Sequence, residues 1–161
     1  MTPSVVLAQD AIDELRNIST GLVLPELSGL DVEATLRLAV ERHIRSTGND
    51  VTLTLSTMPQ REPMALKICA YRIVQESLTN GYRHGGKGKP LVTAEVTDEV
   101  LLLTVETPSS GREFVSRDTS GQPLGLAGMR LRVEVLGGTL SIEAGETVAV
   151  RARLPISPVR A

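Results

Sequence analysis

The sequence predicts an α/β two-layer sandwich, in which helices cover one face of a mixed, mostly antiparallel sheet. The first observation is periodicity: apolar residues three and four apart indicate amphipathic helices, and alternation indicates strands. The second is their order, which is two helices, a strand, a helix, two strands, a helix and two strands. The third is size, since 161 residues with 41% hydrophobic side chains suffice for one packed domain.

Two amphipathic helices and a strand make up the first third of the chain. The first helix is expected over residues 8–22. The second is expected over residues 32–48, with Asp31 as its N-cap and Gly48 at its end. Residues 50–56 then alternate between apolar and polar side chains, which predicts a strand.

A third helix and a hairpin follow. The helix is expected to begin with Pro63 at its first position and to end at Gly85. Strands over residues 90–98 and 99–106 meet at a tight turn around Asp98. The second strand is nearly all apolar, which predicts a central strand buried on both faces. The buried stripe of the helix is expected to be Leu66, Cys69, Ala70, Ile73 and Ser77.

The last third of the chain opens with a long segment without periodicity, residues 107–125. It is rich in glycine, serine, proline and charge, and such loops in compact domains usually serve as lids or binding loops. A fourth helix follows, with its C-cap at Gly137. Two strands, over residues 139–145 and 147–156, complete the predicted sheet.

Composition excludes several classes of function. Aromatic side chains make up only 2% of the chain and its net charge is −2, so neither stacking nor a basic patch favours nucleic acid. No apolar run is long enough to span a bilayer, and the start lacks the pattern of a signal peptide. The single cysteine, Cys69, is expected to be buried in a reducing compartment, which predicts a cytoplasmic protein with no membrane contact by this segment. The parent protein could still be anchored to a membrane.

Three polar residues, Glu76, Asn80 and His84, recur every fourth position of the third helix. This spacing places them on one face. Carboxylate and amide oxygens suit a hard cation such as Mg²⁺, while Arg83 and His84 could meet phosphate oxygens. The alternative is an ordinary solvated helix face, which the spacing alone favours.

Two sequence motifs favour the ligand-binding interpretation over the solvated helix face. "RIVQESLTNGYRHG" and "GLAGMRLRVEVLGGTLSI" resemble the ATP-binding domain of sensor histidine kinases, in the subgroup paired with helix-turn-helix response regulators. The resemblance runs from about Asp10 to Ile156 and is specific at these two motifs. It implies the Bergerat-type ATP fold, with ATP and Mg²⁺ as cofactors.

The resemblance also implies roles for residues of the first motif. Asn80 would be the Mg²⁺ ligand that bridges the nucleotide phosphates. Glu76 would orient or activate the nucleophile or a water on the metal. Arg83 and His84 would contact phosphate or ribose.

By the same resemblance, the second motif implies a phosphate-binding loop. Gly125, Leu126 and Gly128 would match the family's second glycine box, in which backbone NH groups hold phosphate at a helix N-terminus. Without the resemblance, the two glycines would be only a lid hinge and a close-packed helix start.

The sequence departs from the family at the adenine end. Thr107 stands where the family has an aspartate that reads the adenine amino group, and by the resemblance Gly111 would match the first glycine of that box after a shift. A threonine hydroxyl can accept a hydrogen bond but brings no charge. Pro123 replaces a glycine in the second box, which removes one donor NH. Nucleotide affinity is therefore expected to be altered.

The domain organisation follows from the same resemblance. Residues 1–30 would be the end of a dimerisation helix with its linker, residues 31–156 the ATPase domain, and residues 157–161 a tail. The only histidines are His43, expected in the core or at its boundary, and His84. The phosphoacceptor histidine would therefore come from a hairpin on another segment or chain, and a response regulator would be the further partner.

Two alternatives stay open at this stage. The first is a regulatory module of the same fold that has lost nucleotide turnover, because Thr107 replaces the aspartate. The second is a serine kinase of the anti-sigma-factor type, which uses a related fold. The linker-like segment before residue 30 and the word "GMRLRVEVLGG" argue against the serine kinase.

Overall fold

The computed structural model describes residues 27–56, 58, 62–110 and 126–156, and the remaining residues lie outside this description. Five strands form one sheet in the order β1-β2-β3-β5-β4. The β1–β2 pair is parallel and the other pairs are antiparallel. The strands are β1 (Thr52–Leu55), β2 (Leu91–Thr97), β3 (Val100–Pro108), β4 (Thr139–Ala144) and β5 (Thr147–Pro155).

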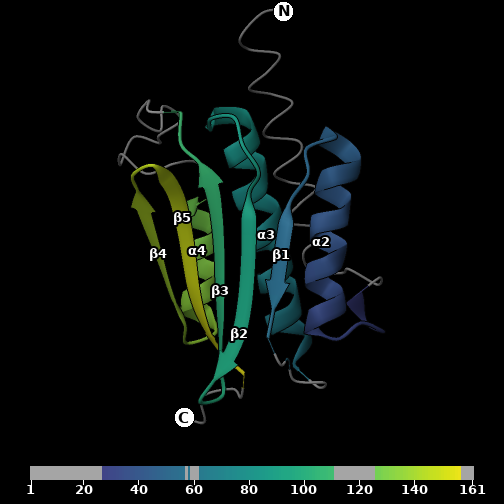
Figure 1. Ribbon diagram of the computed structural model, residues 1–161. Helices are drawn as coiled ribbons and strands as arrows, with labels where there is room; N and C mark the ends of the chain where they lie inside the picture. Colours follow the sequence, from purple (N-terminus) through teal and green to yellow (C-terminus); the bar gives the residue numbers. More distant parts are fainter. Residues whose placement is uncertain (1–26, 57, 59–61, 111–125, 157–161) are drawn as a thin grey trace, which may run out of the picture.

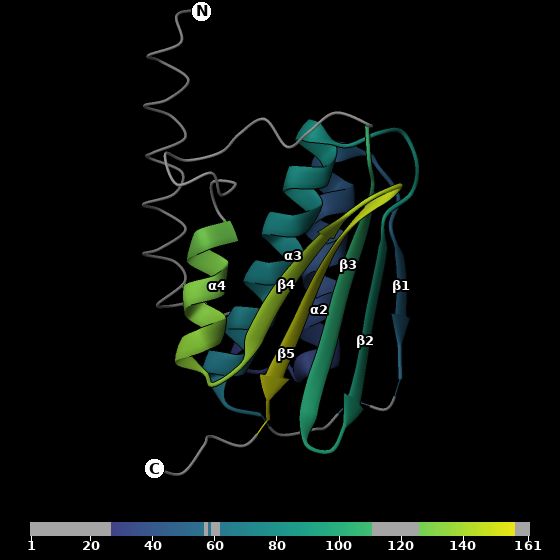
Figure 2. The ribbon, with the colours of Figure 1, turned by 90° about the vertical axis from the view of Figure 1, so that its left-hand side faces the viewer.

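Three helices cover one face of the sheet: α2 (Val32–Thr47), α3 (Met64–His84) and α4 (Leu126–Val135). Figure 1 shows α3 between α2 and α4, and Figure 2 shows the helices on one side of the strands. The predicted two-layer sandwich is confirmed. Within the described ranges, no helix combines the length and apolar character needed to cross a bilayer.

Helix α2 begins and ends as its capping residues predict. The Oδ1 atom of Asp31 accepts a hydrogen bond from the Ala34 backbone N–H at 2.8 Å. Gly48 adopts a φ of 72°, a left-handed conformation that glycine reaches without steric cost, and its N–H donates to Ile44 O at 2.7 Å. His43 is buried on this helix, as expected.

Helix α3 packs against α2, α4 and the sheet, and it carries the residues of the candidate site. Pro63 has a ψ of 144°, so it is the N-cap residue and not the first helical residue, which corrects the predicted start by one position. The five predicted stripe residues are all buried. The stripe is wider than predicted, because it also includes Lys67, whose Nζ donates to the carbonyls of Leu27 and Leu30 at 2.9 Å each.

The β2–β3 hairpin turns at Asp98 and Glu99, whose φ values of 51° and 60° are those of a two-residue type I′ turn. Strand β3 is central in the sheet, but the prediction that it is buried on both faces is wrong. Its burial alternates, since the helices cover one face only. The side chains that face the helices are Leu101, Leu103, Val105 and Thr107.

Strand β3 also extends further than predicted. Thr107 and Pro108 belong to it and pair with Val148 and Thr147 of β5. The loop expected from Thr107 therefore begins after Pro108, and residues 111–125 of it lie outside the described residues. The predicted first helix and the tail also lie outside them.

Helix α4 packs through Met129 and Val133, as expected. Gly137 has a φ of 82°, and the N–H of Gly138 donates to Val133 O at 2.9 Å, which confirms the glycine C-cap. Strand β4 starts directly after this cap, so α4 and β4 form one continuous unit beside α3 (Figure 2).

Candidate functional site

One flank of the C-terminal half of α3 carries the predicted polar residues. Glu76 and Asn80 are half-buried, whereas Arg83 and His84 are exposed in the last turn. At about 100° per residue, these four residues lie within about 100° of the helix circumference and continue, toward the C-terminus, the sector of Cys69 and Ile73. Positive charge is favoured at this end of a helix, and it would also favour a bound phosphate.

The Asn80 amide is the unsatisfied group of this flank. Within the described part of the chain, its Nδ2 atom is buried and has no hydrogen-bond partner. Buried polar groups are nearly always hydrogen-bonded in folded proteins, so an orphaned amide calls for an explanation such as a ligand. Because the two ends of an amide are interchangeable by rotation, the same side chain can offer an oxygen to a cation.

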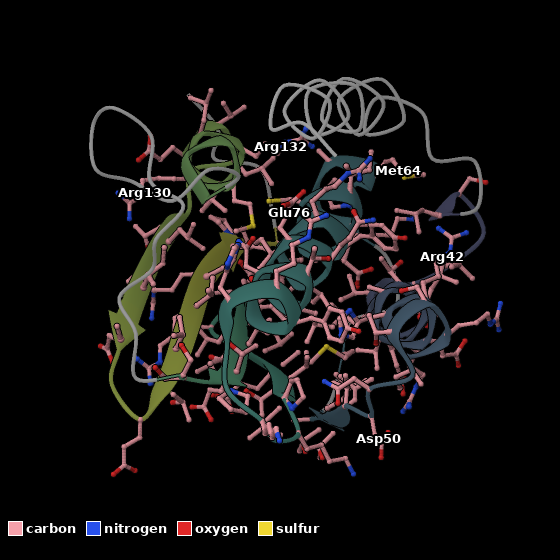
Figure 3. The ribbon with its side chains drawn as sticks, turned by 90° about the horizontal axis from the view of Figure 1, so that it is seen from above. Arg42, Asp50, Met64, Glu76, Arg130 and Arg132 are labelled. Atoms are coloured by element: carbon pink, nitrogen blue, oxygen red, sulfur yellow. The ribbon has the colours of Figure 1, made fainter. Side chains whose placement is uncertain are left out.

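The guanidinium of Arg72 interacts electrostatically with Glu76. Arg72 lies one turn before it, is only 4% exposed, and donates from Nη1 to Gln75 Oε1 at 2.7 Å. Burial lowers the pKa of Arg72, the charge of Arg132 lowers it further, and Glu76 acts in the opposite direction. Seen from above, Arg132 extends from α4 toward α3, and Glu76 lies on that side of α3 (Figure 3).

Cys69 lies near the same two helices but does not take part in the chemistry. Burial raises the pKa of its thiol to about 11, although Arg132 acts in the opposite direction. A thiol with this pKa stays protonated at neutral pH and is a poor nucleophile. Cys69 is therefore the buried core residue that the sequence predicts.

Thr107 meets α3 next to Asn80. It is the last helix-facing residue of β3 and is 4% exposed. A Cβ added at Gly81 would lie 2.4 Å from Thr107 Cγ2, so the two residues are in direct contact. Thr107 thus contacts the residue that directly follows Asn80, although it is 27 positions away from Asn80 in the sequence.

The chain after α3 is held against the end of β3 by its backbone. The N–H of Gly86 donates to Pro108 O at 2.9 Å. A Cβ added at Gly86 would lie 2.4 Å from Ser109 O, and one added at Gly85 would lie 2.6 Å from Pro108 O. This glycine-rich segment is therefore a close approach of two backbones that side chains would prevent.

A hollow of about 400 Å³ lies on the other flank of α3. Neither Asn80 nor the cationic pair Arg83 and His84 lines it. It is therefore separate from the predicted phosphate-binding flank, although the two share the Gly81 turn. Its lining residues are Asn49, Gly81, Tyr82, Gly85, Gly86, Lys87, Gly88, Pro90 and Pro108.

The predicted phosphate loop is described only in part. Gly128 lies in the first turn of α4, and a Cβ added there would meet nothing within 4 Å. Packing within the described residues therefore does not require glycine here, which leaves close approach of a ligand as a reason. Gly111 and Gly125 lie outside the described residues, as does the side chain of Leu126.

The donor set suits a cation that arrives with a nucleotide. Among the described residues, no group of three or more His, Cys, Asp or Glu side chains could hold a metal. Mg²⁺ at phosphate sites typically takes only one or two protein oxygens, with phosphates and waters completing its octahedron. Asn80, with Glu76 one turn before it, could supply such a minimal set.

Three residues of this region escape prediction from the sequence. Gly81 could have been suspected, because glycine in the middle of a helix costs stability and needs a packing or functional reason. Arg72 and Arg132 carry no such signal, since they are sixty residues apart and meet only through the packing of α4 on α3.

Comparison with curated proteins finds similarity to a sensor histidine kinase. The oxygen sensor histidine kinase NreB of Staphylococcus carnosus (strain TM300) is 27% identical over 133 residues, which are 83% of this chain. The chain spans 38% of the length of that relative. No family model matches the chain.

Solved structures share the fold. The catalytic domain of histidine kinase ThkA superposes with a TM-score of 0.63 at 18% identity, covering 80% of this chain and 95% of that domain. ShkA, solved in complex with AMPPNP, gives a TM-score of 0.62 at 20% identity, covering 82% of this chain and 31% of that protein. By the order of its elements and its likeness to these structures, the chain has the fold of histidine kinase catalytic domains, and its sequence is similar to that of NreB.

Proposed function

We propose that this chain is the Mg-ATP-binding catalytic domain of a sensor histidine kinase, which donates the γ-phosphate to a histidine on a separate segment or chain. The observation that carries the proposal is the contact of Thr107 with Gly81, the residue that follows Asn80 on α3. They are the residues expected at the metal end and the base end of a nucleotide. ShkA shares the fold and was solved in complex with AMPPNP, which supports nucleotide binding by this fold.

Each residue has a role that its surroundings allow. Asn80 would hold Mg²⁺ through its amide oxygen, and the metal would neutralise phosphate charge when bound. Arg83 and His84, which are exposed at the end of α3, would contact phosphate or ribose oxygens. The α4 N-terminus with Gly125, Leu126 and Gly128 would add backbone NH donors.

Glu76 would orient the nucleophile or a water on the metal. Its neighbour Arg72, which is positively charged and buried, favours the ionised carboxylate that this role requires. The domain would accelerate transfer by positioning and charge stabilisation, with no covalent intermediate on its own side chains.

The acceptor histidine would belong to a dimerisation hairpin. Of the two histidines in the chain, His43 is 7% exposed, and His84 lies within the proposed phosphate site. A helix-turn-helix response regulator would then take the phosphoryl group. We place the domain in the cytoplasm, where ATP and such regulators are found.

Calorimetric titration of the full chain with Mg-ATP tests the first step. We expect one site per chain, and we expect ATP without Mg²⁺ to bind more weakly. A hairpin peptide that carries the acceptor histidine, added with ATP labelled in the γ-phosphate, tests transfer. Absence of binding at millimolar Mg-ATP would overturn the proposal, and binding without transfer would leave a nucleotide-binding regulatory module.

A further inference from the structure

We propose that Thr107 makes the base end of the site accept both 6-amino and 6-oxo purine nucleoside triphosphates. This inference rests on the proposed nucleotide site, and it assigns a substrate class to that site. The specificity-determining group is the threonine hydroxyl, in the place where an acceptor-only carboxylate is expected.

The position of the Thr107 side chain is tightly constrained. It is on the helix-facing side of β3, where Thr107 pairs with Val148 of β5. The ideal Cβ position of Gly81 is 2.4 Å from its Cγ2, 2.6 Å from its Cβ and 2.9 Å from its Oγ1. A β-branched side chain in such contact has little rotamer freedom, so the hydroxyl oxygen has a defined position.

The hydroxyl is also available to a ligand. No hydrogen bond to it is found among the described residues, although the residue is 4% exposed. The neighbouring amide of Asn80 is in the same condition at its Nδ2 atom. Two polar groups for which no hydrogen bond is found within the described residues, the hydroxyl that contacts Gly81 and the amide on the residue before Gly81, are the pattern expected where a polar ligand completes the hydrogen bonding.

The chemistry of a hydroxyl differs from that of a carboxylate in one decisive respect. A hydroxyl both donates and accepts a hydrogen bond and can rotate its proton to suit the partner, whereas an ionised carboxylate only accepts. The 6-amino group of adenine is a donor, and the 6-oxo group of hypoxanthine is an acceptor. Thr107 can therefore satisfy either base, while an aspartate would repel the 6-oxo oxygen.

The test compares Mg-ATP with Mg-ITP, the inosine nucleotide, by calorimetry on the full chain. The two bases differ only at position 6 and in the proton on N1, so sugar and phosphate contacts cancel in the ratio. We expect the two dissociation constants to agree within about tenfold, and Thr107→Asp to widen the gap in favour of ATP by about tenfold or more. A native chain that already prefers ATP as strongly as Thr107→Asp does would overturn the inference.

A second variant keeps the test decisive if Thr107→Asp does not fold, as checked by circular dichroism. Thr107→Val keeps the shape and removes the hydroxyl, so we expect it to weaken ATP and ITP by similar factors. Unchanged affinity for both nucleotides in Thr107→Val would show that the hydroxyl does not touch the base and would refute the inference. If the native chain binds neither nucleotide, the proposed function itself fails, which is a different result from binding ATP alone.

Discussion

The two flanks of helix α3 differ in how they use their side chains, although only a fraction of a helical turn separates them. On the polar flank, Glu76 lies on the side of α3 that faces α4, and Asn80 follows it one turn later as a second half-buried polar residue. On the tight flank, Gly81 and Gly85 have no side chains, and the helix approaches the end of β3 through its backbone. The polar flank supplies the side chains that we propose bind the ligand, and the tight flank sets the distance between α3 and β3.

The comparison shows how a site can be positioned without a bond between its parts. Asn80 and Thr107 do not touch one another in any recorded hydrogen bond between described residues, yet each is fixed relative to Gly81. The rigid scaffold of helix and strand therefore holds the two polar groups at a set spacing. Changes on the polar flank should alter binding, and changes on the tight flank should alter both stability and binding.

The largest effect is expected on the polar flank. Replacing Asn80 with Ala removes the proposed oxygen ligand of Mg²⁺, so we expect Mg-ATP affinity to fall by at least about 100-fold, roughly 2.7 kcal/mol. The amide Nδ2 atom has no hydrogen-bond partner in the described residues, so the free energy of unfolding should change little. Calorimetry and urea denaturation measure the two quantities separately.

Asn49→Ala is the matched control for this variant. Asn49 lines the hollow of about 400 Å³ on the tight flank, and the same amide is deleted there. We expect Mg-ATP affinity to stay within twofold of the native value. Loss of affinity in Asn49→Ala and not in Asn80→Ala would move the nucleotide to that hollow and contradict the assignment of the polar flank.

The next effect belongs to the tight flank. Gly81→Ala places a methyl group where Thr107 Cγ2 is 2.4 Å away, so the helix and strand must separate. We expect a loss of about 1–3 kcal/mol in the free energy of unfolding, the usual range for overpacking. Mg-ATP affinity should fall as well, because the spacing between Asn80 and Thr107 changes.

A double-mutant cycle with Thr107→Ser checks the cause. Serine lacks Cγ2, the atom closest to the added methyl, so part of the lost stability should return in the double variant. Strict additivity of the two unfolding free energies would show that the Gly81–Thr107 contact is not what forbids a side chain at position 81.

The local chemistry of the chain predicted much of the fold. Asp31 and Gly48 end α2 because capping depends on a few neighbouring residues, and the hairpin turn at Asp98 depends on the same short range. Prediction from local sequence failed where burial depends on how the helix layer packs on the sheet. Strand β3 is apolar along its length, yet the helices cover only one of its faces, which no alternation pattern within β3 could indicate.

The candidate site also has features that local sequence predicted and features that depend on tertiary packing. The spacing of Glu76 and Asn80 placed them on one helix flank, and likeness to a family gave that flank a role. The charge of Arg132 near Arg72 was not predictable, because it arises from the packing of α4 on α3. The contact of Gly81 with Thr107 was hidden for a similar reason, since it joins a helix to a strand that follows a hairpin.

A smaller, pH-dependent effect on stability is expected at His43, which contacts Tyr82 of α3. The His43 ring meets the Tyr82 ring edge to face at 6.1 Å, and burial lowers the pKa of His43 from its ordinary value of 6.5. The unfolded chain therefore takes up a proton at a higher pH than the folded chain. Stability should be fully present above pH 6.5 and should decrease as the pH falls toward the folded pKa, by up to about 1.4 kcal/mol per pH unit.

Urea denaturation at several pH values between 7.5 and 5 measures this loss. His43→Leu cannot titrate and has a similar volume, so its stability should depend less steeply on pH than that of the native chain over this range. Equal slopes in the two proteins would mean that the protonation of His43 is not coupled to folding, and that the tight flank does not sense pH through this contact.

The smallest effect is expected from a change at Ser77, which tests how far the polar flank extends around α3. Ser77 is 3% exposed, and its hydroxyl is buried with no partner among the described residues. Ser77→Ala removes this unsatisfied group and introduces a better helix former, so we expect a gain of about 1 kcal/mol in the free energy of unfolding. Ser46→Ala on α2 is the control for helix propensity, because Ser46 is exposed and its hydroxyl donates to His43 O. If Ser77→Ala instead weakens Mg-ATP binding while Ser46→Ala does not, the hydroxyl belongs to the polar flank, and the site extends further around α3 than the Glu76–Asn80 line.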